Sequence, residues 1–206
     1  QSPRGRLTAM AAVDAGAEFD DTVAGMIDAC LGCRACEAVC PSLVPYGEIL
    51  ESVRAEVAAT RRGPTDVARR AVLGRALASR RALGVATAGA GALQRVGAEW
   101  AVPPRLRSGF EGLRPLGGRG PRFAGRSWSA DGEPVGTVGL LAGCVMDEWF
   151  RPVHEATVAV LTAAGWRVVA PADQTCCGAL AAHDGDRAAA ERLAEANVVA
   201  FADVDV

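Results

Sequence analysis

The fold is decided by the stretch Cys30-Leu31-Gly32-Cys33-Arg34-Ala35-Cys36-Glu37-Ala38-Val39-Cys40-Pro41, which holds four of the seven cysteines of the chain. Cysteines two residues apart direct three thiolates inward from one tight turn. The fourth cysteine precedes a proline, and a residue in that position favours extended backbone over helix. The spacing C-x2-C-x2-C-x3-C-P therefore predicts a 4Fe-4S site with Cys30, Cys33, Cys36 and Cys40 as its ligands.

This run resembles the cluster motif of bacterial ferredoxins. In two-cluster ferredoxins the fourth cysteine ligates the other cluster. The resemblance thus implies that Cys30, Cys33 and Cys36 hold one cluster and that Cys40 reaches a second. The chain contains no second run to supply that other cluster.

Three other interpretations of the four thiols are less favoured. A disulfide framework does not suit an odd number of cysteines in a chain whose composition is not that of a small secreted domain. A structural zinc site normally divides its ligands into two separated pairs. Inert buried cysteines are the third alternative.

Length and composition indicate a globular chain. Its 206 residues, half of them apolar, suit one or two domains. The nearest candidate for a membrane span, residues 82–102, is built of Ala and Gly and carries Arg95 and Glu99. Because no signal peptide is recognisable, we expect reduced thiols and a cytoplasmic location. We expect no transmembrane segment and no nucleic-acid partner.

Charge is unevenly distributed along the chain. Residues 61–126 hold fourteen Arg and three acidic residues, which gives this segment a charge of +11. Because the whole chain has a net charge of −2, the rest of the chain carries −13. A solvated helical face is the favoured explanation. The alternative is a docking surface for an acidic partner or an anionic membrane.

Apolar periodicity predicts helices in the first half of the chain. Asp20 and Asp21 offer an N-cap for the helix that leads to Cys30 and carries Met26 and Ile27 in the core. Recurring Pro and Gly predict a linker over residues 103–134. The expected helices cover residues 7–17, 23–29, 47–59 and 65–82, with glycine weakening the pattern over residues 86–91.

The second half shows a strand, helix, strand pattern. Short apolar strands are predicted at 137–142 and 166–170, with a helix at 153–164 between them. A right-handed crossover makes these strands parallel, so Cys144 and the pair Cys176-Cys177 should converge at one sheet edge. These three cysteines could bind metal. Alternatively, Cys144 is a small apolar residue at the end of a strand, and Cys176 and Cys177 form a buried pair or a vicinal disulfide. Asp186 should cap a helix to Phe201, and residues 203–206 start another strand.

The two cysteine groups together resemble the iron-sulfur subunit of glycolate oxidase, in the larger family that carries the CCG domain. The resemblance rests on the ferredoxin-type run followed by Pro45-Tyr46-Gly47, and on Gly143-Cys144 followed by Cys176-Cys177-Gly178-Ala179-Leu180 and His183. Ser2 to Leu7 resembles the segment after the family's first cluster motif. That upstream motif and the second half of the CCG domain are absent from this sequence, which predicts that both ends are cut. Leu43 replaces a usual Gly, which predicts a less strained turn.

The resemblance implies an α+β chain in three parts. Residues 1–60 form a mainly helical ferredoxin-type region, residues 61–135 a basic helical segment and linker, and residues 136–206 the first half of an α/β CCG domain. It implies an oxidoreductase subunit that relays electrons through 4Fe-4S clusters. An FAD-containing partner would oxidise glycolate, and electrons would pass to the quinone pool from a peripheral position on the inner face of the membrane. The missing upstream motif would supply the remaining ligands, including the partners of Cys40.

No catalytic residue is expected on this chain, because flavin would carry the hydride chemistry. Related alternatives are subunits of lactate utilisation, anaerobic glycerol-3-phosphate dehydrogenase or heterodisulfide reductase, or a zinc or redox-sensing thiol protein. Tyr46 and Arg34 are expected to tune the hydrogen bonding of the first cluster. Among the remaining residues, His183 is expected to cap or pack, His154 to lie at the surface, and Trp149, Phe150 and Trp166 to lie in the core.

Overall fold

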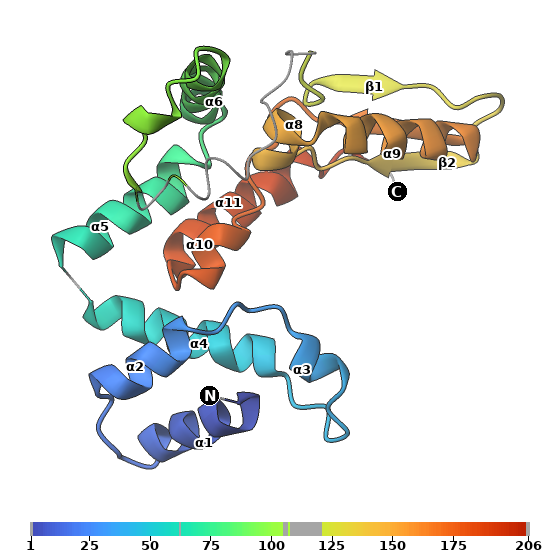
Figure 1. Cartoon of the computed structure of the whole chain (residues 1–206). Helices are drawn as coiled ribbons and strands as arrows, with labels where there is room; N and C mark the ends of the chain where they lie inside the picture. Colours follow the sequence, from blue (N-terminus) through green and yellow to red (C-terminus); the bar gives the residue numbers. More distant parts are fainter. Residues whose placement is uncertain (1, 62, 105–106, 108–120, 205–206) are drawn as a thin grey trace. The chain divides into compact units, whose positions relative to one another are not determined.

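The structure is a computed structural model that describes residues 2–61, 63–104, 107 and 121–204. It contains many helices and one small three-stranded sheet, as an α+β chain should (Figure 1). The chain divides into two compact units, each described separately below. Unit 1 comprises Gln1–Gly74 with Ala179–Ala190, and unit 2 comprises Arg75–Gly178 with Glu191–Val206. The predicted domain boundaries after residues 60 and 135 remain predictions.

Unit 1 is helical. The predicted cap at Asp20 is confirmed, since its carboxylate accepts a hydrogen bond from the Val23 N–H at 2.8 Å. Ser2 caps the first helix in the same way, which moves its start upstream of the predicted residue 7. The helices are α1 (Pro3–Asp14), α2 (Asp21–Asp28), α3 (Ala35–Ala38), α4 (Tyr46–Thr60), α5 (Pro64–Ala71) and α10 (Ala179–His183).

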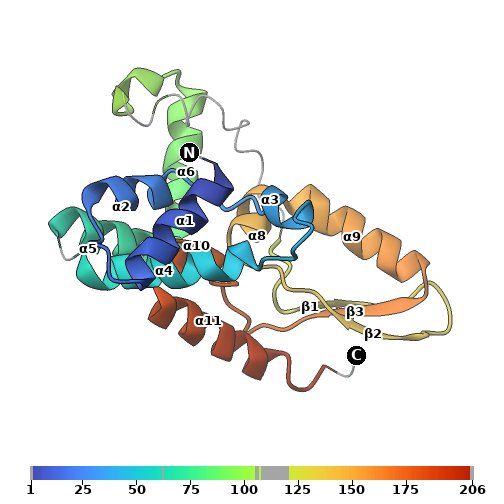
Figure 2. The same ribbon diagram turned by 90° about the horizontal axis from the view of Figure 1, so that it is seen from below.

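The core of unit 1 lies between α1, α2 and α4, which pack side by side in both views (Figures 1 and 2). Its buried side chains are Met10, Ile27, Tyr46 and Leu50. Ile27 is fully buried, as predicted, whereas Met26 is only half-buried. This core holds the end of α2, from which the Cys30 loop departs.

The prediction of one continuous helix over residues 65–82 is wrong, because this segment is divided into separate elements. Helix α5 ends at Ala71, a π-helical turn η1 (Val72–Ala76) follows, and Ser79 caps a new helix, α6 (Arg80–Arg95). The glycine-rich residues 86–91 are nevertheless helical. Packing of Leu83, Thr87 and Gly91 on the buried side of α6 outweighs the low helix propensity of glycine. A short 3-10 turn, η2 (Glu99–Ala101), comes next.

Unit 2 is built on the sheet β1 (Arg126–Trp128), β2 (Gly136–Gly139) and β3 (Trp166–Ala170), in the order β1-β3-β2. Strands β2 and β3 are parallel, with Val138 opposite Val168, and α9 (Arg151–Ala163) connects them across one face of the sheet (Figure 2). The predicted βαβ unit is therefore confirmed, with β3 at its predicted bounds. Strand β2 is shorter than predicted, although the Leu140 N–H still bonds to the Val169 carbonyl.

The linker predicted over residues 103–134 is wrong in its second half. Strand β1 pairs antiparallel with β3, and Phe123 is buried in the core of unit 2. Phe123 stacks on Trp128 with ring centroids 5.3 Å apart, and the Arg126 guanidinium lies over both rings. A three-residue strand is too short to show a period-2 pattern. Residues 105–106 and 108–120 of the predicted linker lie outside the described residues.

Two side-chain predictions in unit 2 are also wrong. Phe150 is 47 % exposed, because it lies at the junction between α8 (Val145–Trp149) and α9. His154 is buried, because it shares the inner face of α9 with Val158 and Thr162. Trp149 is partly buried and donates its indole N–H to Thr87 at 2.8 Å, and Trp166 packs against Gly136.

The last helix, α11 (Arg187–Ala200), begins at the predicted cap, where Asp186 accepts a hydrogen bond from the Ala189 N–H at 3.1 Å. Asp203 and Val204 lie in no strand, and the rest of the predicted final strand falls outside the described residues. Within the described part of the chain, no helix has the length and apolar character needed to cross a bilayer.

Two cysteine groups as candidate metal centres

The first group lies on the loop between α2 and α4 of unit 1. Cys30 follows the C-cap residue of α2, Cys36 lies in α3, and Cys40 precedes the turn into α4. Arg34 and Leu43 adopt positive φ angles of 55° and 49°, which non-glycine residues rarely do. The less strained turn predicted for Leu43 is therefore wrong. Such strain clusters at functional sites.

The sulfur atoms of Cys30 and Cys40 accept hydrogen bonds that lower the pKa of both thiols. Burial raises the pKa of Cys30, but the Tyr46 hydroxyl at 3.5 Å, the Gly32 N–H and nearby arginines together lower it below its ordinary value. The backbone N–H groups of Val44, Ser42 and Leu43 lower the pKa of Cys40. Both sites thus favour the thiolate, which is the form that ligates metals.

Arg34 supports the loop itself. Its guanidinium makes a two-pronged ion pair with Glu37, at 2.7 and 2.9 Å, and Glu37 also accepts a hydrogen bond from the Gly47 N–H at 3.0 Å. Its described side-chain hydrogen bonds go to Glu37. Of the two residues expected beside the first cluster, Tyr46 contacts a cysteine sulfur, whereas Arg34 holds Glu37, which joins α3 to the start of α4.

The second group lies in unit 2, beyond the carboxyl ends of β2 and β3. The Sγ atoms of Cys144 and Cys176 lie 3.2 Å apart in buried positions, and Cys177 is exposed but hydrogen-bonds to Cys176. The predicted convergence of these thiols is confirmed. The hydrogen bond between Cys144 and Cys176 lowers the pKa of Cys144 to about 7 and raises that of Cys176. Leu83 packs on the pair and excludes water from it.

Three polar side chains hold the backbone of this group; one of them, His154, was expected at the surface, and the other two were not predicted. Gln174 accepts a hydrogen bond from the Ala142 N–H at 2.7 Å, and His154 Nε2 donates to the Ala142 carbonyl at 3.0 Å. Asn197 donates to the Cys176 carbonyl at 2.9 Å. The four-residue spacing of His154 from Val158 could have placed His154 on the buried helix face. Gln174 and Asn197 carry no comparable signal.

His183 neither caps a helix nor enters a cysteine group. It ends α10, and its Nδ1 lies 3.0 Å from a Glu51 carboxylate oxygen in a half-exposed contact, while its carbonyl accepts a hydrogen bond from Arg54. It therefore attaches α10 to α4.

The donor chemistry of both groups fits iron-sulfur ligation. All seven cysteines are free thiols, and N–H, O–H or S–H groups stabilise a thiolate at Cys30, Cys40 and Cys144. The positions of these thiols do not form a complete set of ligands around a metal ion. Among the residues described here, no three Cys, His, Asp or Glu side chains gather into a group that could hold a metal ion. Cys30, Cys33 and Cys36 are thus on one loop but are not closed around a common point.

Comparison with known proteins concerns the second group first. Residues 138–206 match the family model described as "CCG: Cysteine-rich domain". The whole chain is similar to a protein of Bacillus subtilis (strain 168) named "Probable glycolate oxidase iron-sulfur subunit", with 34 % identity over 219 aligned residues. This confirms the resemblance found in the sequence. The chain spans about half the length of this curated relative, 49 % of it. No solved structure matches the chain significantly.

Proposed function

We propose that this chain is the iron-sulfur electron-transfer subunit of a glycolate oxidase complex. It receives electrons from an FAD-containing subunit that oxidises glycolate to glyoxylate, and it passes them toward a quinone. The observation that carries the proposal is the presence, in one chain, of the C-x2-C-x2-C-x3-C-P run and a CCG domain. The similarity to the Bacillus subtilis subunit over the full chain supports it.

The residues have separate roles in this proposal. Cys30, Cys33 and Cys36 ligate one 4Fe-4S cluster and Cys40 ligates a second. Cys144, Cys176 and Cys177 bind a further cluster at the sheet edge. Bound clusters supply one-electron acceptance and release. The chain itself supplies thiolates, the N–H and O–H groups that stabilise them, and the cover of Leu83 over the buried pair.

Metal analysis of anaerobically purified protein tests the proposal. We expect stoichiometric iron and acid-labile sulfide, together with a ferredoxin-type EPR signal after reduction. Stoichiometric zinc without labile sulfide would overturn the proposal in favour of a zinc or thiol-sensing protein. The substrate that reduces the copurifying flavoprotein then distinguishes glycolate from other 2-hydroxy acids and from glycerol 3-phosphate.

Location and surface contacts follow from the same proposal. A quinone acceptor requires the complex to lie at the inner face of the cell membrane, where the chain would attach peripherally. Three arginines of the basic segment 61–126 already have partners within unit 1: Arg61 pairs with Asp28, Arg69 pairs with Asp184, and Arg70 bonds to two carbonyls. Docking through the basic segment therefore depends on its other arginines.

A further inference from the structure

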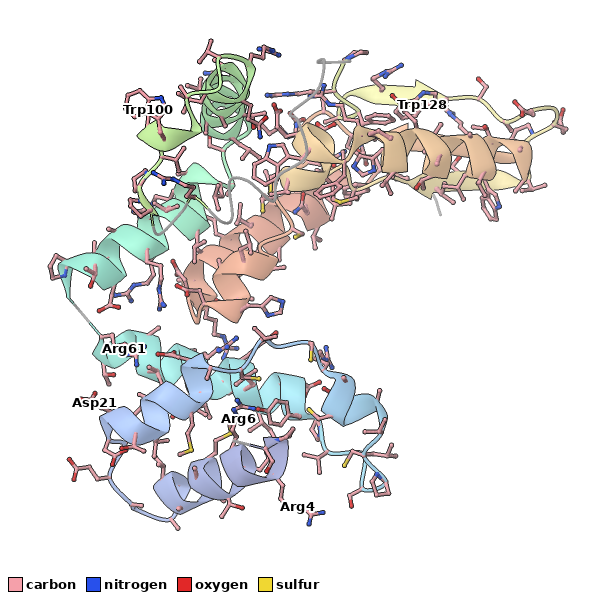
Figure 3. All side chains as sticks on the ribbon, viewed as in Figure 1. Arg4, Arg6, Asp21, Arg61, Trp100 and Trp128 are labelled. Carbon is pink, nitrogen blue, oxygen red and sulfur yellow. The ribbon has the colours of Figure 1, made fainter. Side chains whose placement is uncertain are left out.

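Arg6 is an unusual residue in unit 1. It is 9 % exposed, and its Nε donates a hydrogen bond to the Met26 carbonyl at 2.7 Å. None of the ion pairs found among the described residues includes Arg6. Arg4, on the same helix, points away from the unit, whereas Arg6 points from α1 toward α4 (Figure 3). Arg6 is thus a buried cation that makes no ion pair with any carboxylate of the described residues.

Arg6 is linked to Cys30 through Tyr46. The Arg6 side chain interacts with the Tyr46 hydroxyl, and this hydroxyl donates to Cys30 Sγ at 3.5 Å. Tyr46 is 3 % exposed, so the hydroxyl that donates to Cys30 is shielded from water. Tyr46 thus lies between Arg6 and Cys30, and the fixed positive charge of Arg6 is close to the Cys30 sulfur atom.

Arg54 adds a second positive charge from α4. Its Nη2 donates to the carbonyls of Cys30 at 2.5 Å and Ile27 at 3.3 Å, and its Nη1 donates to the His183 carbonyl at 2.9 Å. These contacts fix the backbone at Cys30 and keep the guanidinium beside it. Both arginines therefore act on the same end of the loop.

A buried charge is costly unless an opposite charge compensates it. At Arg6 the available anion is the Cys30 thiolate, together with whatever negative group that thiolate binds. A cluster held by thiolates is anionic, and its negative charge increases by one on reduction. A fixed cation close to it therefore stabilises the reduced state more than the oxidised state.

We infer that Arg6, acting through Tyr46, is the counter-charge of the redox group bound at Cys30 and raises its reduction potential. This inference rests on the proposed function. The step is a one-electron uptake from an external reductant, in which no bond forms or breaks and no proton moves. Arg6 and Tyr46 are positioning residues, because they act on the redox group through the Cys30 sulfur.

The test is a dithionite titration, monitored by EPR, of the full chain purified anaerobically with its partners. In Arg6→Gln and in Tyr46→Phe we expect the ratio of reduced to oxidised cluster at a fixed potential to fall about tenfold, which is ~59 mV for a one-electron couple. Arg6→Lys keeps the charge and should restore most of the ratio. Arg95→Gln, which removes an exposed arginine of α6, is the matched control and should leave it unchanged.

The outcomes distinguish a failure of the proposed function from a failure of the counter-charge inference. Wild-type protein without iron and labile sulfide would refute the proposed function. Wild-type iron content in Arg6→Gln with an unchanged midpoint potential would overturn only the counter-charge. If Arg6→Gln fails to fold, Tyr46→Phe decides, because it removes one hydroxyl without creating an unpaired buried charge. An unshifted potential in Tyr46→Phe would then refute the inference.

Discussion

The side-chain oxygen of Gln174 accepts a hydrogen bond from the backbone N–H of Ala142 at 2.7 Å, across thirty-two positions of the sequence. The same side chain donates to the carbonyls of Leu140 at 3.1 Å and Pro171 at 2.9 Å. Gln174 is 2 % exposed. One buried amide thus joins the two loops that carry Cys144 and Cys176.

Replacing Gln174 should separate these loops. Gln174→Leu leaves one N–H and two carbonyl groups without their partner, and a buried unsatisfied group costs roughly 1–3 kcal/mol. We expect the free energy of unfolding, measured in urea, to fall by about 3 kcal/mol. Glu155→Ala, at an exposed position of α9, is the control and should stay within about 0.5 kcal/mol of wild type. A wild-type midpoint for Gln174→Leu would show that the loops are held by other contacts.

Gly185 is required where the chain passes close to α4. Its φ is +83°, and a Cβ at this position would overlap the carbonyl group of Arg54. Gly185→Ala should therefore lower the free energy of unfolding by about 3 kcal/mol, from backbone strain and overpacking together. Gly16 has a φ of +101° but no atom near its Cβ position. Gly16→Ala should cost only about 1 kcal/mol, and equal losses at both sites would contradict the overlap.

The features that could be predicted from the sequence differ physically from those that could not. Short-range signals were sufficient for Asp20 as a helix cap, for β3, and for the meeting of Cys144 with Cys176, because spacing and crossover handedness determine them. Long-range contacts were not visible. Gln174 bonds to Ala142 and Arg6 to Met26, which lie 32 and 20 positions away, and β1 is stabilised by pairing with β3 rather than by its own pattern.

Asp184 should make stability depend on pH. Burial raises the pKa of Asp184 above its ordinary value of 3.8, and Arg69 at 3.2 Å offsets this only in part. The folded state therefore binds the proton more tightly than the unfolded state does. As pH rises from the ordinary value of 3.8 through the folded-state pKa, wild-type protein should lose stability relative to Asp184→Asn. Urea unfolding of both proteins between about pH 3.5 and 7 measures this difference, and a wild-type advantage that grows with pH would contradict the raised pKa.

Cys33 provides the most direct test of the first cysteine group. It is exposed on the α2–α4 loop, so Cys33→Ser removes one thiolate with little disturbance of the core. In the assembled complex we expect the loss of one ferredoxin-type EPR signal and of quinone reduction, while substrate still reduces the flavin. The separation arises because hydride transfer to flavin does not need the clusters, whereas one-electron transfer beyond it does.

The matched control for Cys33→Ser lies in the same loop. Leu31 is 92 % exposed between Cys30 and Cys33, so Leu31→Ala changes the loop without removing a sulfur atom. It should keep both the EPR signal and quinone reduction. If Cys33→Ser reduced quinone at the wild-type rate with the signal intact, Cys33 would not be a ligand, and electrons would not depend on this loop. If Leu31→Ala lost the signal as well, the loss would reflect the fold of the loop rather than the Cys33 thiolate.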